Sequence, residues 1–138
     1  MTRNIKYTEV NWWIWAVVAG CLLWGLTGEL LARHLAMAIS ATVAVIYLSR
    51  HGNVRHFPTQ VRVAYALWMA ASFVPELTFM YWIQTAGTTA LITLGYCPLA
   101  RLLLIFPWNR TVPLTWRRLF IIAFHPPVAG SVLTGLPL

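Results

Sequence analysis

The sequence predicts an all-α integral membrane protein with about four transmembrane helices and a short C-terminal interfacial helix. Of the 138 residues, 59% are hydrophobic and only 9% are charged, whereas soluble domains carry about a quarter charged residues. The apolar residues also gather into long runs, each close to the roughly 20 residues that a helix needs to cross about 30 Å of hydrocarbon. These two observations favour a protein that is solvated by lipid.

The apolar runs divide the chain into four predicted helices at about 11–27, 30–48, 61–82 and 88–106. A tight break at Thr27 to Glu29 separates the first two, and a hydrophilic stretch at 49–60 separates the second from the third. A short turn is predicted at Gln84 to Gly87, and Cys97-Pro98 interrupts the fourth run. All four are expected to form a single membrane domain over residues 1–138.

The basic residues predict the orientation of these helices. With the N-terminus inside, the two outer turns contain no Lys or Arg, and only Arg33 lies near one of them. The inner segments hold the rest of the flanking basic residues: Arg3, Lys6, Arg50, Arg55, Arg62, Arg110, Arg117 and Arg118. This asymmetry follows the positive-inside rule and predicts a multi-pass protein of the cell inner membrane with both termini cytoplasmic. The net charge of +7 does not indicate nucleic-acid binding, because the basic residues form no stripe.

The C-terminal region is expected to remain at the membrane surface. Pro113 suits the first turn of a helix, and Arg117-Arg118 beside aromatic residues suits one that lies in the interface plane, at about 113–124. The tail 125–138 is predicted to be irregular, because its prolines and glycines would break a helix in lipid. A fifth crossing from Leu119 to Leu138 stays open on hydrophobicity alone.

Glu76 is the residue most indicative of function. A carboxylate inside a membrane run is costly and usually faces a partner or a cavity. Because Glu76 and Arg33 lie toward the outer ends of their predicted helices, we expect an intramembrane ion pair between them. Glu29 competes for Arg33 at the favourable i,i+4 spacing. The alternative is that Glu76 binds a proton or an ion, as in a transporter.

His34 is a possible ligand for a haem or a chlorophyll-type pigment. A bis-histidine haem would need two histidines at one depth, and His34 alone lies toward the outer side; the others are His51, His56 and His125. No cofactor is therefore predicted, although a single-histidine pigment site at His34 stays open. The sequence shows no metal-ligand cluster.

Cys97 is a possible reactive thiol, because Arg101 follows it by one helical turn and a nearby cation favours the thiolate. The alternative for Arg101 is that it extends toward the cytoplasmic headgroups. Small residues at helix-packing spacing predict close helix contacts within the chain or with a partner. They are Ala16, Gly20, Ala36, Ser40, Ala44, Ala66 and Ala70.

Residues 61–107 resemble the YgaP-like transmembrane domain, a two-helix membrane unit that is also attached to membrane-bound rhodaneses. The shared features are Val61-Arg62-Val63, the Trp-and-Gly turn from Trp82 to Gly87, and Leu-Gly-Tyr-Cys-Pro-Leu from Leu94 to Leu99. The resemblance implies a helical hairpin rather than a defined activity. A second cysteine usually follows this motif in the family, and residues 100–110 contain none.

The sequence predicts a protein that is not an enzyme. It carries three acidic residues and no Ser/His/Asp set, phosphate loop or paired carboxylates. We expect a small accessory or assembly subunit that packs against a larger membrane complex, of respiratory or photosynthetic type. The alternatives are a small oligomeric transporter or channel that uses the Glu/Arg pair, and a haem- or pigment-binding subunit.

Overall fold

The computed structural model describes residues 9–128 and 132–138, and these are helical with no strand. The elements are α1 (Val10–Gly25), α2 (Leu30–His51), α3 (Phe57–Ala71), the 3₁₀ turn η1 (Pro75–Leu77), α4 (Phe79–Leu94), α5 (Pro98–Leu103), α6 (Trp116–Phe124) and α7 (Val132–Gly135). The all-α prediction is confirmed. One helix in this part of the chain, α2, is long and apolar enough to cross a membrane by length and composition, and α1 is apolar but shorter.

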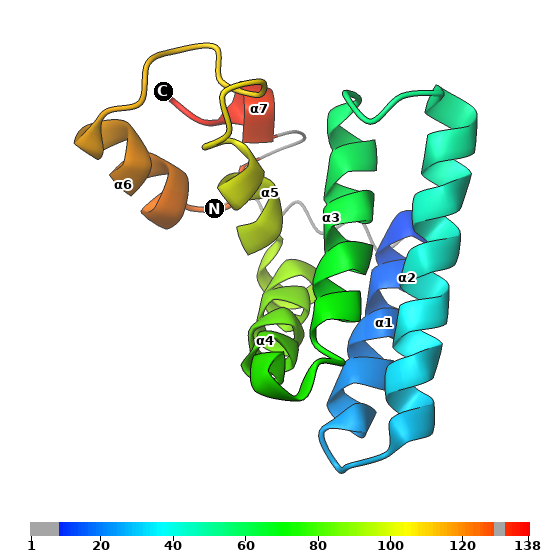
Figure 1. Cartoon of the computed structure of the whole chain (residues 1–138). Coiled ribbons are helices and arrows are strands. Elements are labelled where there is room, and N and C mark those ends of the chain that lie inside the picture. The colour runs from blue at the N-terminus through cyan, green and yellow to red at the C-terminus, as the bar shows by residue number, and fades with distance from the viewer. Residues whose placement is uncertain (1–8, 129–131) are drawn as a thin grey trace.

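The first four helices form an up-and-down bundle (Figure 1). α1 packs against α2 and α4, and α3 packs against α2 and α4, so that each helix contacts two others. Short connections make neighbouring helices antiparallel, as is typical of such bundles. α5 continues in the direction of α4, and α6 and α7 lie beside it at one end of the bundle (Figure 1).

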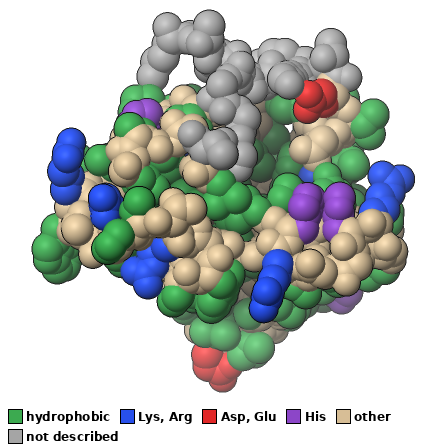
Figure 2. Space-filling model, turned by 90° about the horizontal axis from the view of Figure 1, so that it is seen from above, with side chains coloured by type: hydrophobic (Ala, Val, Ile, Leu, Met, Phe, Trp, Pro, Cys, Tyr) green, Lys and Arg blue, Asp and Glu red, His purple; other side chains and the backbone are tan. Residues whose placement is uncertain are grey.

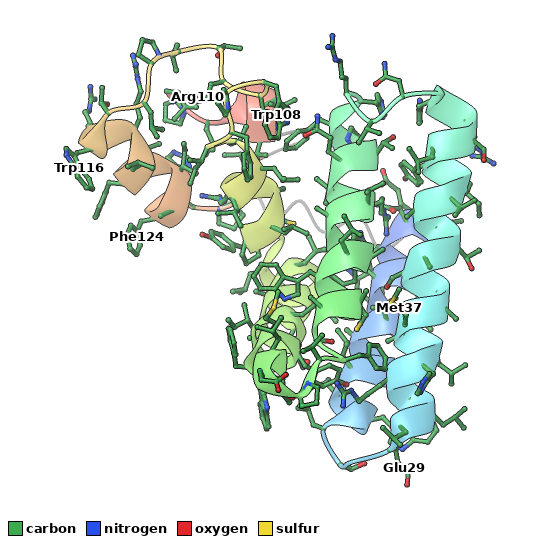
Figure 3. The ribbon with its side chains drawn as sticks, viewed as in Figure 1. Glu29, Met37, Trp108, Arg110, Trp116 and Phe124 are labelled. Carbon is green, nitrogen blue, oxygen red and sulfur yellow. The ribbon has the colours of Figure 1, made fainter. Side chains whose placement is uncertain are left out.

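The bundle has two ends of different character. We call the end formed by residues 26–29 and 72–78 the turn end; Glu29 marks it in Figure 3. The opposite end, formed by residues 52–56 and 104–115, is the basic end, and Arg110 marks it (Figure 3). Seen from the basic end, Arg and His side chains are spread across its face between apolar ones (Figure 2).

The first two predicted helices agree with the structure within a few residues, but the next two do not. α3 ends at Ala71, the chain reverses at 72–78, and α4 runs through the predicted turn at Gln84 to Gly87. Pro75 explains the reversal, because the residue before a proline is biased to an extended conformation and Val74 has φ −71° and ψ 127°. The polar residues near Gln84 face the interior of the bundle instead of forming a loop.

The break at Cys97-Pro98 is where the sequence places it. Gly95 ends α4 with φ +73°, a left-handed conformation that favours glycine, and Pro98 begins α5. Nearer the C-terminus, α6 falls within the predicted interfacial helix, with Thr115 as its N-cap accepting a hydrogen bond from the Arg118 amide. The predicted irregular tail contains one short helix, α7.

The core has two parts. The larger one fills the centre of the bundle with residues from α1 to α4: Trp15, Val18, Leu22, Ala36, Tyr65, Met69 and Tyr81. The smaller one joins α5, α6 and α7 to the start of α3: Phe57, Ala100, Leu103, Leu104, Ile122 and Leu136. The C-terminal elements are thereby packed onto the basic end of the bundle.

Candidate functional site

A cavity of about 270 Å³ lies between α1, α3, α4 and the start of α5. Its wall is mainly apolar and aromatic, with Trp15, Trp68, Gly87 and Leu102 among the lining residues. The volume is close to the lower end of the range for small-molecule pockets. The cavity is thus large enough for a ligand and is suited to an apolar one.

Polar side chains from α3 and α4 form one part of this wall. Gln84 and Thr88 are one turn apart on α4 and buried, and both line the cavity together with Tyr65 of α3. Gln84 Nε2 donates to the Tyr65 carbonyl at 3.2 Å, and the Tyr65 hydroxyl lies 2.7 Å from Thr88 Oγ1. These contacts fasten α3 to α4 inside the bundle.

Sequence reasoning missed this polar wall. The sequence predicts a turn at Gln84, whereas the i,i+4 spacing of Gln84 and Thr88 is the pattern that places two polar groups on one helix face. Read as part of a helix, that pattern would have indicated a polar stripe facing the bundle.

A second cavity, of about 260 Å³, adjoins the first toward the basic end and shares Trp15, Leu91 and Cys97 with it. Arg62 of α3 lines it. The guanidinium lies 4.0 Å from the Trp15 ring centroid and 5.3 Å from that of Tyr47, and it donates to Asn11 Oδ1. Aromatic faces and an amide oxygen therefore contact this buried cation.

Arg33 also lies among neutral groups. Its guanidinium donates to the Ser72 carbonyl at 2.9 Å and lies 5.0 and 4.8 Å from the ring centroids of Phe73 and Tyr81. Ser72 is the C-cap of α3, so Arg33 stabilises the negative end of that helix. Glu76 is exposed in η1. The predicted Glu76–Arg33 ion pair is not formed, because the chain leaves α3 before Glu76.

The two residues should therefore respond differently to substitution. Arg33→Gln is expected to lower the free energy of unfolding by about 2 kcal/mol, because it removes a charged donor and two cation–π contacts. Glu76→Gln should change it by less than about 0.5 kcal/mol, as is usual for exposed side chains. SDS titration in mixed micelles measures both. Equal losses of unfolding free energy in the two variants would instead support an ion pair between Arg33 and Glu76.

Arg101 caps a helix in the same way. It is 3% exposed, and it donates to the carbonyls of Ile122 at 2.9 Å and of Pro126 at 3.2 Å, at the C-terminal end of α6. Its guanidinium lies 4.2 Å from the Tyr96 ring centroid. Arg101 thus attaches α6 to α5. The headgroup alternative requires Arg101 to extend to the surface, and it does not.

Cys97 is the N-cap of α5, and its Sγ accepts a hydrogen bond from the Ala100 amide at 3.4 Å. It is a free thiol, and so is Cys21. The guanidinium of Arg101, which is the basis for a possible reactive thiol at Cys97, donates to two carbonyls at the end of α6. The residue lines both cavities, so its place in the fold is at their junction.

His34, His51 and His56 lie near the two ends of the bundle, and His125 follows α6. His34 is exposed on α2, with Nδ1 2.7 Å from the Leu30 carbonyl and its ring 5.2 Å from that of Phe73. At the basic end, the rings of His51 and His56 stack 3.8 Å apart, a proximity that the sequence analysis did not predict. Across residues 9–128 and 132–138, no group of three or more His, Cys, Asp or Glu side chains is placed to hold a metal ion.

The small residues divide into buried and outward-facing sets. Ala36, Ser40 and Ala44 are buried along one face of α2, together with Ala32. Ala16 and Ala66 are half-buried, and Gly20 and Ala70 are exposed. A Cβ built on Gly20 meets no atom within 4 Å. The α2 face is therefore used inside the bundle, whereas Gly20 lies on an outer surface.

Comparison with protein-family models, curated proteins and solved structures finds no match for this chain. The resemblance of residues 61–107 to the YgaP-like domain stays a prediction.

Proposed function

We propose that the protein is a multi-pass inner-membrane protein in which α1, α2, α3 and the α4–α5 pair each cross the bilayer. The observation that carries this proposal is the exposure of large apolar side chains around a bundle whose interior also holds polar ones. Polar side chains such as Gln84, Thr85 and Thr88 are buried, while large apolar side chains are exposed along the sides of the bundle. They include Trp13, Val17, Leu23, Leu31, Leu35, Val45, Ile46, Leu67, Phe79 and Ile83.

Exposed aromatic residues near both ends support this placement. Trp24 and Trp82 lie near the turn end, and Trp108 and Trp116 lie near the basic end; all four are exposed. Tryptophan prefers the boundary between headgroups and hydrocarbon. α2, with 22 residues, extends about 33 Å between the two ends, close to the thickness of a bilayer core. α1 and α3, with 16 and 15 residues, cover a smaller part of this thickness than α2.

The amphipathic helix α6 would then lie in the inner interface. Trp116, Phe120 and Phe124 are spaced one turn apart and are all exposed; Trp116 is 87% exposed. Figure 3 shows Trp116 and Phe124 at opposite ends of α6, and both line an open groove between α6 and α5. Arg117 and Arg118 at the start of the helix are placed to contact anionic headgroups.

Reporter tags test this topology. We expect a tag after Asn53 and a tag after Arg110 to report the cytoplasm, and a tag after Val74 to report the opposite compartment. The reason is that the basic end carries Arg50, Arg55 and Arg110. If the tags after Asn53 and Val74 share a compartment, the crossing of α3 is refuted.

Within the membrane, we propose that the protein serves as a small accessory subunit of a larger complex. Gly20 supports this role, because an exposed glycine on the side of a membrane helix lets a partner helix approach closely. The respiratory or photosynthetic type of the complex is inferred from the sequence alone. The transporter alternative loses its main support, since Arg33 contacts the Ser72 carbonyl and Glu76 is exposed.

Native sizing in mild detergent tests this role. The wild-type protein should migrate as part of an assembly much larger than its own 15.6 kDa. Gly20→Leu should release it, because the new side chain blocks the approach of a partner without a clash inside the chain. Val45→Leu, an exposed change on α2, is the matched control. An isolated wild-type monomer would contradict the proposal.

A further inference from the structure

We propose that the cavity between α1, α3, α4 and α5 binds a small apolar molecule that carries a hydrogen-bond donor, such as the hydroxyl of an alkylphenol or a long-chain alcohol. This inference goes beyond the accessory role. It depends on the cavity and on the orientation of two polar side chains in its wall, Gln84 and Tyr65.

The orientation of the Gln84 amide is fixed by its neighbour. Nε2 lies 3.2 Å from the Tyr65 carbonyl, which can only accept, so the amide nitrogen must face it. Oε1 is then left over, and it is buried without a hydrogen-bond partner in the described residues, on a side chain that is 6% exposed. A buried polar atom without a partner costs about 1–3 kcal/mol. Gln84 Oε1 therefore offers an unused acceptor.

Tyr65 presents a second acceptor. Thr88 Oγ1 donates to the Gln84 carbonyl at 2.8 Å, so its proton is committed. The 2.7 Å contact between Thr88 and Tyr65 must then use the phenol proton of Tyr65. The Tyr65 oxygen keeps a lone pair, and both residues line the same cavity. A ligand that satisfies this wall donates a hydrogen bond.

The remaining wall selects an apolar body. Trp15, Trp68 and Leu102 give large apolar surfaces, and Trp68 uses its indole nitrogen elsewhere, donating to the Met80 carbonyl at 2.9 Å. Pockets of this kind bind through apolar contact, and a few polar groups fix the orientation of the ligand. The chemistry of the site thus indicates an apolar molecule held by its hydroxyl.

The test uses two probes that differ at the phenol oxygen, where the ether carries a methyl group in place of the donor proton. Tritiated 4-octylphenol is bound to the detergent-purified protein, and unlabelled 4-octylphenol and its methyl ether, 4-octylanisole, compete with it. We expect saturable binding of the phenol and at least tenfold weaker competition by the ether, because the ether cannot donate to Gln84 or Tyr65. Gln84→Met should reduce the affinity for the phenol toward that for the ether, because it removes one of the two acceptors.

A second variant tests the cavity without changing the polar wall. Gly87 lines the cavity, and a Cβ there meets only Pro98, at 3.5 and 3.7 Å, which is ordinary contact. Gly87→Leu should fold and should abolish binding of the phenol, whereas Ala86→Leu, exposed on α4 and outside the cavity, should leave it unchanged. Equal binding of phenol and ether, or undiminished binding by Gly87→Leu, would overturn the proposal. If Gln84→Met does not fold, the comparison of phenol with ether and the binding of the phenol by Gly87→Leu still test the proposal.

Discussion

Gly25→Ala is expected to destabilise the protein by about 3 kcal/mol, which combines overpacking with the loss of a buried hydrogen bond. Gly25 is the last residue of α1, where α1 meets α4. A Cβ at this position would lie 2.1 Å from the Tyr81 hydroxyl oxygen. That hydroxyl donates to the Leu22 carbonyl at 2.6 Å, so it cannot move away without losing its partner. SDS titration in mixed micelles gives the change in the free energy of unfolding.

Two further variants show whether the contact with Tyr81 is the cause. In Gly25→Ala with Tyr81→Phe, the nearest remaining atoms are Arg33 Cγ at 3.0 Å, in a flexible side chain, and the ring Cζ at 3.2 Å. The double variant should therefore lose less stability than the sum of the two single variants. Gly20→Ala on the same helix is the control, and it should be neutral or stabilising because alanine favours a helix and the site is open. Strict additivity of Gly25→Ala and Tyr81→Phe would exclude this explanation.

Arg101→Met is expected to detach α6 from the bundle and to lower the free energy of unfolding by about 3 kcal/mol. The substitution leaves the Ile122 and Pro126 carbonyls without their charged donor, and hydrogen bonds to charged groups contribute about 1.5–3 kcal/mol each. It also removes the favourable charge at the C-terminal end of α6. Limited proteolysis of the 104–115 connection should become faster.

Arg117→Met is the matched control. Arg117 is exposed on α6, and its substitution changes the net charge by the same amount as Arg101→Met. It should leave both the proteolysis rate and the unfolding free energy close to those of the wild type. Arg101→Lys should lie between the two, since a lysine keeps the charge but loses the planar guanidinium that reaches two carbonyls. An Arg101→Met protein with wild-type proteolysis would mean that apolar packing alone holds α6.

The sequence predicted α1 and α2 closely because their limits are set by local signals. Gly28, with φ +97°, and Gly52, with φ +65°, lie at left-handed positions after the two helices, and both apolar runs end there. The reversal at Pro75 was missed because residues 61–82 are apolar on both sides of it. Hydropathy cannot distinguish one long helix from two short ones that meet at an apolar turn, and the polar residues near Gln84 gave a false turn signal.

The sequence by itself determined that the chain is helical and apolar, and that most of its basic residues lie near the ends of its apolar runs. These properties depend on composition and on local order, which sequence patterns record directly. The tertiary structure decided the partners of the buried polar groups. Arg33 and Arg101 cap other helices, and Gln84 and Tyr65 meet at a cavity, because these contacts join residues far apart in the chain. No local pattern specifies which distant carbonyl will lie within reach of a side chain.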